Sequence, residues 1–444
     1  MRNETARVKS LFFFDWLERF SAKIRVMHAD VIIVGGGLSG GLLALRLALG
    51  QPEPRILLLE RSNTLGGNHT WGFSTTGDAP EWLRPIISKT WTKFDVRFPR
   101  TDKAFDLQFH VIRSQDFNKG LKTRLGPNIV LNCEVSQISD SHVSTRDGKV
   151  YRAPLVIDAT GIHDELIDIG RSRYADVPCG WMKYIGFDLK VRTGTKTKND
   201  WHSNPTIFDA RVPQMDGFRS FSTIPIDEET LYVQETFLSS NPNLNPHRLS
   251  RSLITYVKRL GWELDPTSPI IRQEEAVVPL PLHVFSDDRV LAKEQALEVT
   301  AAEDFIARSP IQISPAKGWS HPTRGQAVSD SLRVAEFIAS QPRLRTGPVR
   351  AALRDFRRDW VSQQAFYRTF NRMIFKAAEP SLRHVAFDRL FSLKDDVVGR
   401  FLTGETSKSD ATKILATKPP LRTGKIYRNW ASEKEIAKEP ETPA

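Results

Sequence analysis

The stretch VIIVGGGLSG, residues 31–40, decides the fold of this chain. An apolar, strand-like run enters a glycine turn in which Gly35, Gly37 and Gly40 keep the spacing G-x-G-x-x-G. The first glycine allows the tight turn, the second lets backbone approach a pyrophosphate, and the third lets the following helix pack closely on the strand. Free N–H groups at the start of that helix, where Ser39 lies, favour negative charge. The pattern therefore predicts a dinucleotide-binding site.

An acidic residue closes the next predicted strand. Glu60 follows the apolar run 56–59 and lies 20 residues after Gly40. From that position a carboxylate accepts hydrogen bonds from ribose hydroxyls. The apolar residues 42–48 predict the helix between the two strands. Because strand, turn, helix and acid agree, we interpret the motif as a cofactor site rather than a structural turn. The motif does not distinguish FAD from NAD.

Composition narrows the class of protein. The chain has 444 residues, of which 40% are hydrophobic, and this predicts a folded protein with one large core or two to three subdomains. Its two cysteines, Cys133 and Cys179, have no C-x-x-C partner. A disulfide scaffold is therefore excluded, no metal site is expected, and a reducing cytosol fits. No run of 18 apolar residues occurs, so no membrane-spanning helix is predicted.

The formal net charge is +11, yet no nucleic-acid recognition motif occurs, so no nucleic-acid partner is expected. Arginines between 343 and 400 alternate with Phe, Trp and Leu, a pattern that suits an anionic membrane surface. A solvated basic face is the alternative. We expect a cytoplasmic protein that binds a membrane peripherally. Residues 1–28 are either an interfacial amphipathic helix or an over-called start before Met27, and we favour the second. The sequence predicts no oligomeric state.

Periodicity predicts an α/β fold with an inserted, largely antiparallel β domain and a helical C-terminal part. Strand-like alternation covers 180–285 with one helix near 245–261, and the pattern is helical from about 324 to 415. Asp147-Gly148 is expected to turn a hairpin. The predicted units are an N-terminal extension (1–28), the first part of the dinucleotide-binding domain (29–175), a β-rich substrate domain (176–290), the return of the dinucleotide-binding domain (291–345), a helical region (346–420) and a charged tail (421–444).

Six ordered segments resemble the bacterial lycopene β-cyclases, which are FAD-dependent carotenoid cyclases, and the likeness spans about 29–420. The segments are Gly66-Gly67-Asn68-His69-Thr70-Trp71, Thr206-Ile207-Phe208-Asp209-Ala210, Val278-Pro279-Leu280-Pro281-Leu282, His321-Pro322-Thr323-x-Gly325, Phe370-Asn371-Arg372-Met373-Ile374-Phe375 and Lys413-Ile414-Leu415-Ala416-Thr417-Lys418-Pro419-Pro420.

The resemblance implies the FAD-binding Rossmann-like fold of the hydroxylase and glutathione-reductase type, with FAD in its reduced form and NAD(P)H as electron donor. It implies a carotenoid substrate, lycopene, whose ends close to β-ionone rings without net redox change. A proton adds to the terminal double bond, a carbocation closes the ring, and a proton leaves. The cofactor-binding residues implied by the resemblance are Gly35, Gly37, Ser39, Gly40, Glu60, Gly66, Gly67, His69, Gly161, His321, Pro322 and Gly325.

Some of these residues also have structural interpretations. His69 can cap its loop, Trp71 can be a packing residue, and His321 can fix the loop before the long helix. Glu274 and Glu275 are expected to face solvent.

The predicted substrate strand departs from the family pattern at its acid. The family reads apolar-Glu-Glu/Asp-Thr, and its first carboxylate is the candidate acid, whereas this chain has Gln234 there. An amide releases no proton at useful pH and offers a carbocation only a dipole. Glu235 is the remaining catalytic candidate, because a carboxyl among the apolar Val233 and Phe237 would have a raised pKa. Pairing of Glu235 with an arginine is the structural alternative.

Other polar changes fall in the expected pocket, at Met182, Asp188, Arg324 and Gln326. They leave three functions open. The first is a lycopene β-cyclase, with Glu235 or the reduced flavin as proton source. The second is another FAD-dependent oxidoreductase, such as a hydroxylase or reductase, because one fold hosts many chemistries. The third is a catalytically silent FAD-binding paralogue.

Overall fold

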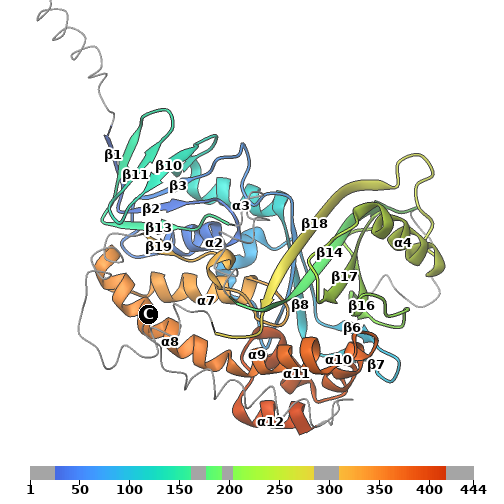
Figure 1. The fold of residues 1–444 in the computed structure, drawn as a ribbon. Coiled ribbons are helices and arrows are strands. Elements are labelled where there is room, and N and C mark those ends of the chain that lie inside the picture. Colours follow the sequence, from blue (N-terminus) through green and yellow to red (C-terminus); the bar gives the residue numbers. More distant parts are fainter. Residues whose placement is uncertain (1–25, 162–176, 193–203, 285–309, 417–444) are drawn as a thin grey trace, which may run out of the picture.

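The computed structural model describes residues 26–161, 177–192, 204–284 and 310–416 (Figure 1). The predicted charged tail and nearly all of the predicted N-terminal extension lie outside these residues. The described part is mixed α/β, with two large sheets, two small ones and a helical C-terminal region.

The glycine motif lies in a five-stranded parallel sheet with the order β19-β13-β2-β3-β9. The central strands β2 and β13 are buried along their whole length, as expected for parallel strands covered on both faces. The strands are β2 (Val31–Val34), β3 (Ile56–Leu59), β9 (Ile129–Val130), β13 (Leu155–Asp158) and β19 (Ile311–Gln312).

Helices pack on this sheet and connect it to the rest of the chain. Helix α2 (Leu38–Leu47) follows the glycine turn and shares a hydrophobic core with α3 (Ser114–Leu125) and α7 (Val328–Ala339). A four-stranded sheet lies alongside, with the order β1-β12-β11-β10. Its strands are β1 (Val26–His28), β10 (Val135–Ile138), β11 (His142–Thr145) and β12 (Val150–Arg152). The predicted hairpin turn is confirmed, since Gly148 has φ +80° between the antiparallel β11 and β12.

The second large sheet has seven strands in the order β18-β14-β17-β16-β15-β6-β7, antiparallel except between β15 and β6. Its strands are β6 (Phe94–Arg97), β7 (Asp102–Phe105), β14 (Cys179–Lys190), β15 (Thr206–Asp209), β16 (Phe218–Pro225), β17 (Thr230–Ser239) and β18 (Ile270–Pro281). We expected this sheet to come from 176–290 alone. The strands β6 and β7 correct that boundary, because their buried aromatic residues join the aromatic core beneath the sheet.

One face of the seven-stranded sheet is covered by α4 (Pro246–Arg259), close to the predicted helix (Figure 1). A three-stranded sheet has the order β4-β8-β5, with β4 (Thr70–Thr75), β8 (Gln108–Arg113) and β5 (Lys89–Trp91). The C-terminal helices, orange to red in Figure 1, are α8 (Thr346–Gln363), α9 (Ala365–Arg372), α10 (Arg383–Phe391), α11 (Asp395–Thr403) and α12 (Lys408–Ala416). No helix among the described residues is both long and apolar enough to cross a bilayer.

Candidate active site

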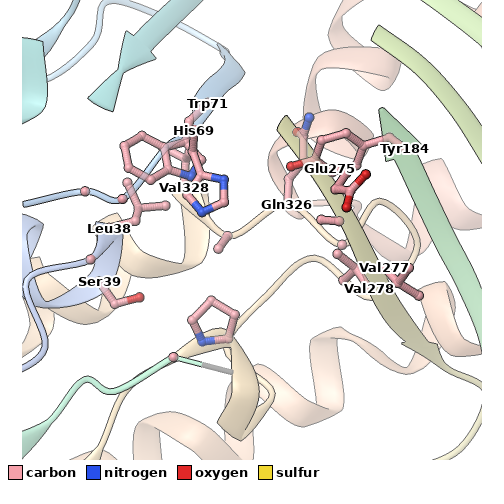
Figure 2. Close-up of a pocket in the computed structure, with 18 of the residues that line it drawn as sticks. Leu38, Ser39, His69, Trp71, Tyr184, Glu275, Val277, Val278, Gln326 and Val328 are labelled. Carbon is pink, nitrogen blue, oxygen red and sulfur yellow. The ribbon is translucent and has the colours of Figure 1, made fainter. Parts of the chain in front are cut away.

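A single cavity of about 1650 Å³ runs from the glycine motif to the face of the seven-stranded sheet that α4 leaves free. Figure 2 shows its two sides, with Leu38, Ser39, His69 and Trp71 on one and the β18 residues on the other.

The glycine turn forms a backbone cradle at one end of this cavity. Gly40 must be glycine, because a Cβ there would lie 2.0 Å from the carbonyl oxygen of Gly35. Gly37 is different, since a Cβ there would meet nothing within 4 Å, and the residue lines the cavity. Gly37 is also the N-cap of α2 and supplies no side-chain cap. The first N–H groups of α2 therefore face open space, an arrangement that fits a pyrophosphate.

Glu60 is held at the rim of the cradle. Its Oε2 accepts a hydrogen bond from the Gly36 N–H at 2.7 Å, and its Oε1 accepts one from the Ser62 N–H at 2.8 Å. The carboxylate lines the cavity and is fixed in place. A carboxylate has further lone pairs, so Glu60 can still accept from ribose hydroxyls.

The loop after β3 supplies the next part of the wall. Gly66 and Gly67 have φ of +80° and +61° and line the cavity. The Gly66 N–H donates to the carbonyl of Gly36 at 2.9 Å, which joins this loop to the glycine turn. His69 also lines the cavity, with its ring 5.6 Å from that of Trp71. Burial lowers the pKa of His69, which favours a neutral imidazole.

Gly161 and Gly325 reach the cavity, but His321 does not line it. The His321 ring is buried, with Nε2 2.8 Å from the carbonyl of Phe401 and Nδ1 3.2 Å from the N–H groups of Thr323 and Arg324. Burial lowers the pKa of His321 to about 3. The geometry therefore corrects the predicted cofactor contact and gives His321 its structural role of fixing the loop. Pro322, beside it, is likewise outside the cavity wall.

The opposite end of the cavity is mostly apolar. Side chains from the seven-stranded sheet, from β8 and from α10 line it. They are Phe109, Trp181, Met182, Ile207, Phe208, Phe218, Ile224, Leu238 and Phe387.

Three polar residues of β17 face this apolar space. Tyr232, Gln234 and Thr236 line the cavity on alternate positions of the strand. The Tyr232 hydroxyl lies 2.7 Å from Gln234 Oε1, and Gln234 Nε2 donates to Thr236 Oγ1 over 2.7 Å. Strand alternation predicted this shared face.

Glu235 lies on the other face of β17, against α4. Its side chain is wholly buried, its Oε1 accepts from Arg219 Nε at 2.7 Å, and Ser252 of α4 is 3.2 Å away. Desolvation raises the pKa of Glu235, opposed by Arg219. The pairing with an arginine, which was the structural alternative, is present, and the residue lies behind the sheet rather than in the cavity. This placement argues against Glu235 as the proton donor to a substrate.

Glu274 corrects a second expectation, because it is 4% exposed rather than facing solvent. Its Oε2 accepts from the Thr70 N–H at 2.9 Å and from Arg272 Nη1 at 3.1 Å, and its Oε1 contacts the Tyr232 hydroxyl. Arg272 also pairs with the buried Asp188. The sequence alone did not indicate the burial of Glu274, because that burial depends on how β18 pairs with β14. No local sequence pattern specifies this register.

Arg324, another departure noted in the sequence, is a buried part of the cavity wall. Its Nη1 donates to the carbonyl of Leu402 at 3.0 Å, and its guanidinium lies 6.0 Å from the Phe208 ring centroid. Burial lowers the pKa of Arg324 to about 10, so its side chain stays cationic near neutrality.

Solved structures of other proteins share the fold of this chain. The fold is similar to that of a flavin-dependent brominase (TM-score 0.54, 15% identity, 93% of this chain and 100% of that one). It is also similar to a geranylgeranyl bacteriochlorophyll reductase-like protein of Thermoplasma acidophilum (TM-score 0.51, 14% identity, 92% and 99%). The predicted fold class is thus confirmed, since this chain shares its fold with both proteins over nearly their whole length.

The family follows from the sequence comparisons. The chain belongs to the family described as lycopene cyclase protein, whose model matches residues 30–426. It is 30% identical over 402 residues to the lycopene β-cyclase of Pseudescherichia vulneris, covering 90% of this chain and 96% of that protein. It is 28% identical over 398 residues to the lycopene β-cyclase of Pantoea ananas, covering 89% and 96%.

Proposed function

We propose that this protein is a lycopene β-cyclase that binds FAD in the glycine cradle and closes the ends of a carotenoid on the free face of the seven-stranded sheet. One observation carries the proposal: the cradle and an apolar chamber with a polar cluster are two ends of the same cavity. Family membership supports the same reaction.

The residues of the cradle fit FAD. Gly37 and the start of α2 would hold the pyrophosphate, Glu60 the ribose, and the cavity-lining Gly66, Gly67 and His69 would continue the site. Ser39, Gly161 and Gly325 also line the cavity. Bound in its reduced form, with NAD(P)H as the electron source, FAD would supply an electron-rich ring beside the developing cation.

The apolar chamber suits a polyene. Aromatic rings stabilise a nearby carbocation through their negative faces, and Tyr232 and Phe208 are among the aromatic residues that line the cavity. The reaction needs a proton at the terminal double bond and a base to remove one after ring closure. The amide of Gln234 can direct its carbonyl dipole to the cation but cannot supply the proton.

Delivery of a carotenoid requires contact with lipid, so we propose that the protein is cytoplasmic and bound peripherally to a membrane. Exposed arginines support this, including Arg343, Arg345 and Arg354 on and before α8. Other arginines of the basic pattern serve the fold instead: Arg383 is buried, and Arg400 pairs with Asp410 at 2.7 Å.

Expression in a lycopene-accumulating bacterium tests the function. The expected result is β-carotene or γ-carotene in the pigment extract and a yellow, FAD-loaded purified protein. Unchanged lycopene with FAD-loaded protein would reject the cyclase assignment. The lack of an acid at position 234 would then favour a silent paralogue, whereas substrate-dependent oxygen consumption would indicate a flavin oxidoreductase.

A further inference from the structure

The polar cluster on the sheet spans three strands. In the register of the sheet, Gly186 of β14 stands opposite Gln234 of β17 on one side and opposite Glu274 of β18 on the other. A Cβ at Gly186 would lie 2.5 Å from the Tyr232 hydroxyl oxygen. The glycine thus leaves the gap through which the Tyr232 hydroxyl crosses the middle strand and reaches the carboxyl group of Glu274.

The Tyr232 hydroxyl lies between the amide of Gln234 and the carboxyl group of Glu274. The hydroxyl carries one hydrogen but lies within reach of two acceptor oxygens, Gln234 Oε1 and Glu274 Oε1. On its other side, the Gln234 amide lies 2.7 Å from Thr236 Oγ1. The phenol can therefore donate either to the cavity-facing amide of Gln234 or to the buried Glu274, and it connects the two.

The surroundings of Glu274 leave one oxygen for this exchange. Its Oε2 is occupied by the Thr70 N–H and by Arg272, while Oε1 faces Tyr232. His69 Nδ1 lies 3.9 Å from Oε2. Burial raises the pKa of Tyr232, so the phenol keeps its proton near neutral pH.

We propose that Glu274 and Tyr232 form a proton relay that replaces the acid missing at Gln234. This inference rests on the proposed cyclase function and concerns the same cavity. The Tyr232 hydroxyl gives its proton to the terminal double bond, forming a C–H bond, and takes the proton of Glu274 in the same movement. The Glu274 carboxylate then faces the carbocation through Tyr232. After ring closure the ring carbon loses a proton along the reverse route, which regenerates the Glu274 carboxyl group, so protons balance and no oxidant is needed.

The relay is tested with the purified full-length protein, reduced FAD and lycopene in phosphatidylglycerol vesicles. Glu274→Gln and Tyr232→Phe keep the shape of the cluster but remove the transferable proton. We expect each to lower kcat by about 100-fold or more, with little change in KM or FAD content, since positioned acid–base groups contribute on this scale. Glu229→Gln, an exposed carboxylate in the turn before β17, is the matched control and should keep the wild-type rate.

A rescue variant separates chemistry from structure. Adding Gln234→Glu to Glu274→Gln returns a carboxyl group to the cavity face of the same strand, and we expect at least a tenfold recovery of kcat. A purely structural role for Glu274 would give no recovery. Wild-type rates in both single variants would overturn the relay while leaving the cyclase function standing. A wild-type protein that forms no ring would overturn both.

Discussion

At Gln234, one amide stands where the resemblance to the lycopene β-cyclases implied a carboxylate. The exchange replaces a full negative charge with a dipole at the place where positive charge develops. The Tyr232 hydroxyl 2.7 Å away and the buried Glu274 behind it keep ionisable groups within the same cluster. In the proposed relay, the carboxylate of Glu274 therefore acts on the substrate through the Tyr232 phenol and not by direct contact.

Gln234→Glu should therefore raise the rate of cyclisation. The new carboxyl group would face the cavity directly and offer the cation a charge instead of a dipole. We expect an increase of about tenfold in kcat, measured as cyclic carotenoid formed per FAD-loaded protein, because a charged partner strengthens a hydrogen-bonding interaction by more than 1 kcal/mol. A rate lower than that of the wild type would show that the amide itself is needed.

Glu235→Gln should act on stability and not on the chemistry. The substitution leaves the Arg219 guanidinium, which is 7% exposed, without its charged partner. Breaking a buried pair in this way costs about 3 kcal/mol, visible as a lower denaturant midpoint. Product formed per folded, FAD-loaded molecule should stay near the wild-type value. Loss of product at unchanged stability would restore Glu235 as the catalytic acid.

At the scale of elements, periodicity predicted which side chains of one strand share a face and not which strands meet. Tyr232, Gln234 and Thr236 were placed together from the sequence because strand alternation is local. Glu274 was misplaced, because its burial depends on the pairing of β18 with β14 and on contacts with the loop after β3. The joining of β6 to β15 was missed for the same reason, since the two strands are about 110 residues apart.

The buried His321 in the loop 321–326 should make the stability of the protein depend on pH. Burial lowers the pKa of His321 from 6.5 to about 3 in the folded protein. Because this pKa is lower in the folded protein, the unfolded chain binds the proton more readily. The contribution of His321 to the free energy of unfolding is therefore fully present above about pH 6.5 and is lost as the pH falls towards 3. His321→Asn should flatten the urea-unfolding stability over this interval. The same acid-dependent loss in the variant would show that other groups cause it.

The glycine turn shows how much of the cofactor site the sequence predicted. The roles of Gly35, Gly37 and Gly40 follow from spacing, because a turn, a close approach and a helix contact are short-range requirements. His321 was misjudged, because its partner Phe401 lies 80 residues away. The motif-bearing end of the cavity was thus more predictable than the end built from distant strands.

Two glycine variants separate folding from cofactor binding. Gly37→Ala adds a methyl group to open space in the cradle, so the free energy of unfolding of the apoprotein should change by less than about 0.5 kcal/mol while FAD affinity falls. Gly40→Ala forces a methyl group to 2.0 Å from the Gly35 carbonyl oxygen and should destabilise the apoprotein by about 1–3 kcal/mol. Equal effects of both variants on stability would contradict the cradle.

For the molecule as a whole, the cavity lies between the two large sheets, and each sheet contributes one end of it. The glycine turn after β2 brings the first N–H groups of α2 to one end of the cavity, where we propose that FAD binds. The antiparallel sheet presents an apolar face with one polar cluster at the other end. The C-terminal helices share an aromatic core with the second sheet, for example where the Phe218 and Phe387 rings lie 4.8 Å apart. Cofactor and substrate would therefore meet at the junction between the two sheets.

The most direct measurement of the central claim is cyclisation in heavy water. Purified protein, reduced FAD and lycopene would be incubated in D₂O. The pigments would then be separated, and their molecular masses would be measured by mass spectrometry. One proton enters the terminal double bond and a different one leaves. The account therefore predicts β-carotene or γ-carotene carrying one deuterium for each ring closed after the relay has exchanged its protons with solvent. Lycopene recovered without rings, or rings formed without deuterium, would contradict it.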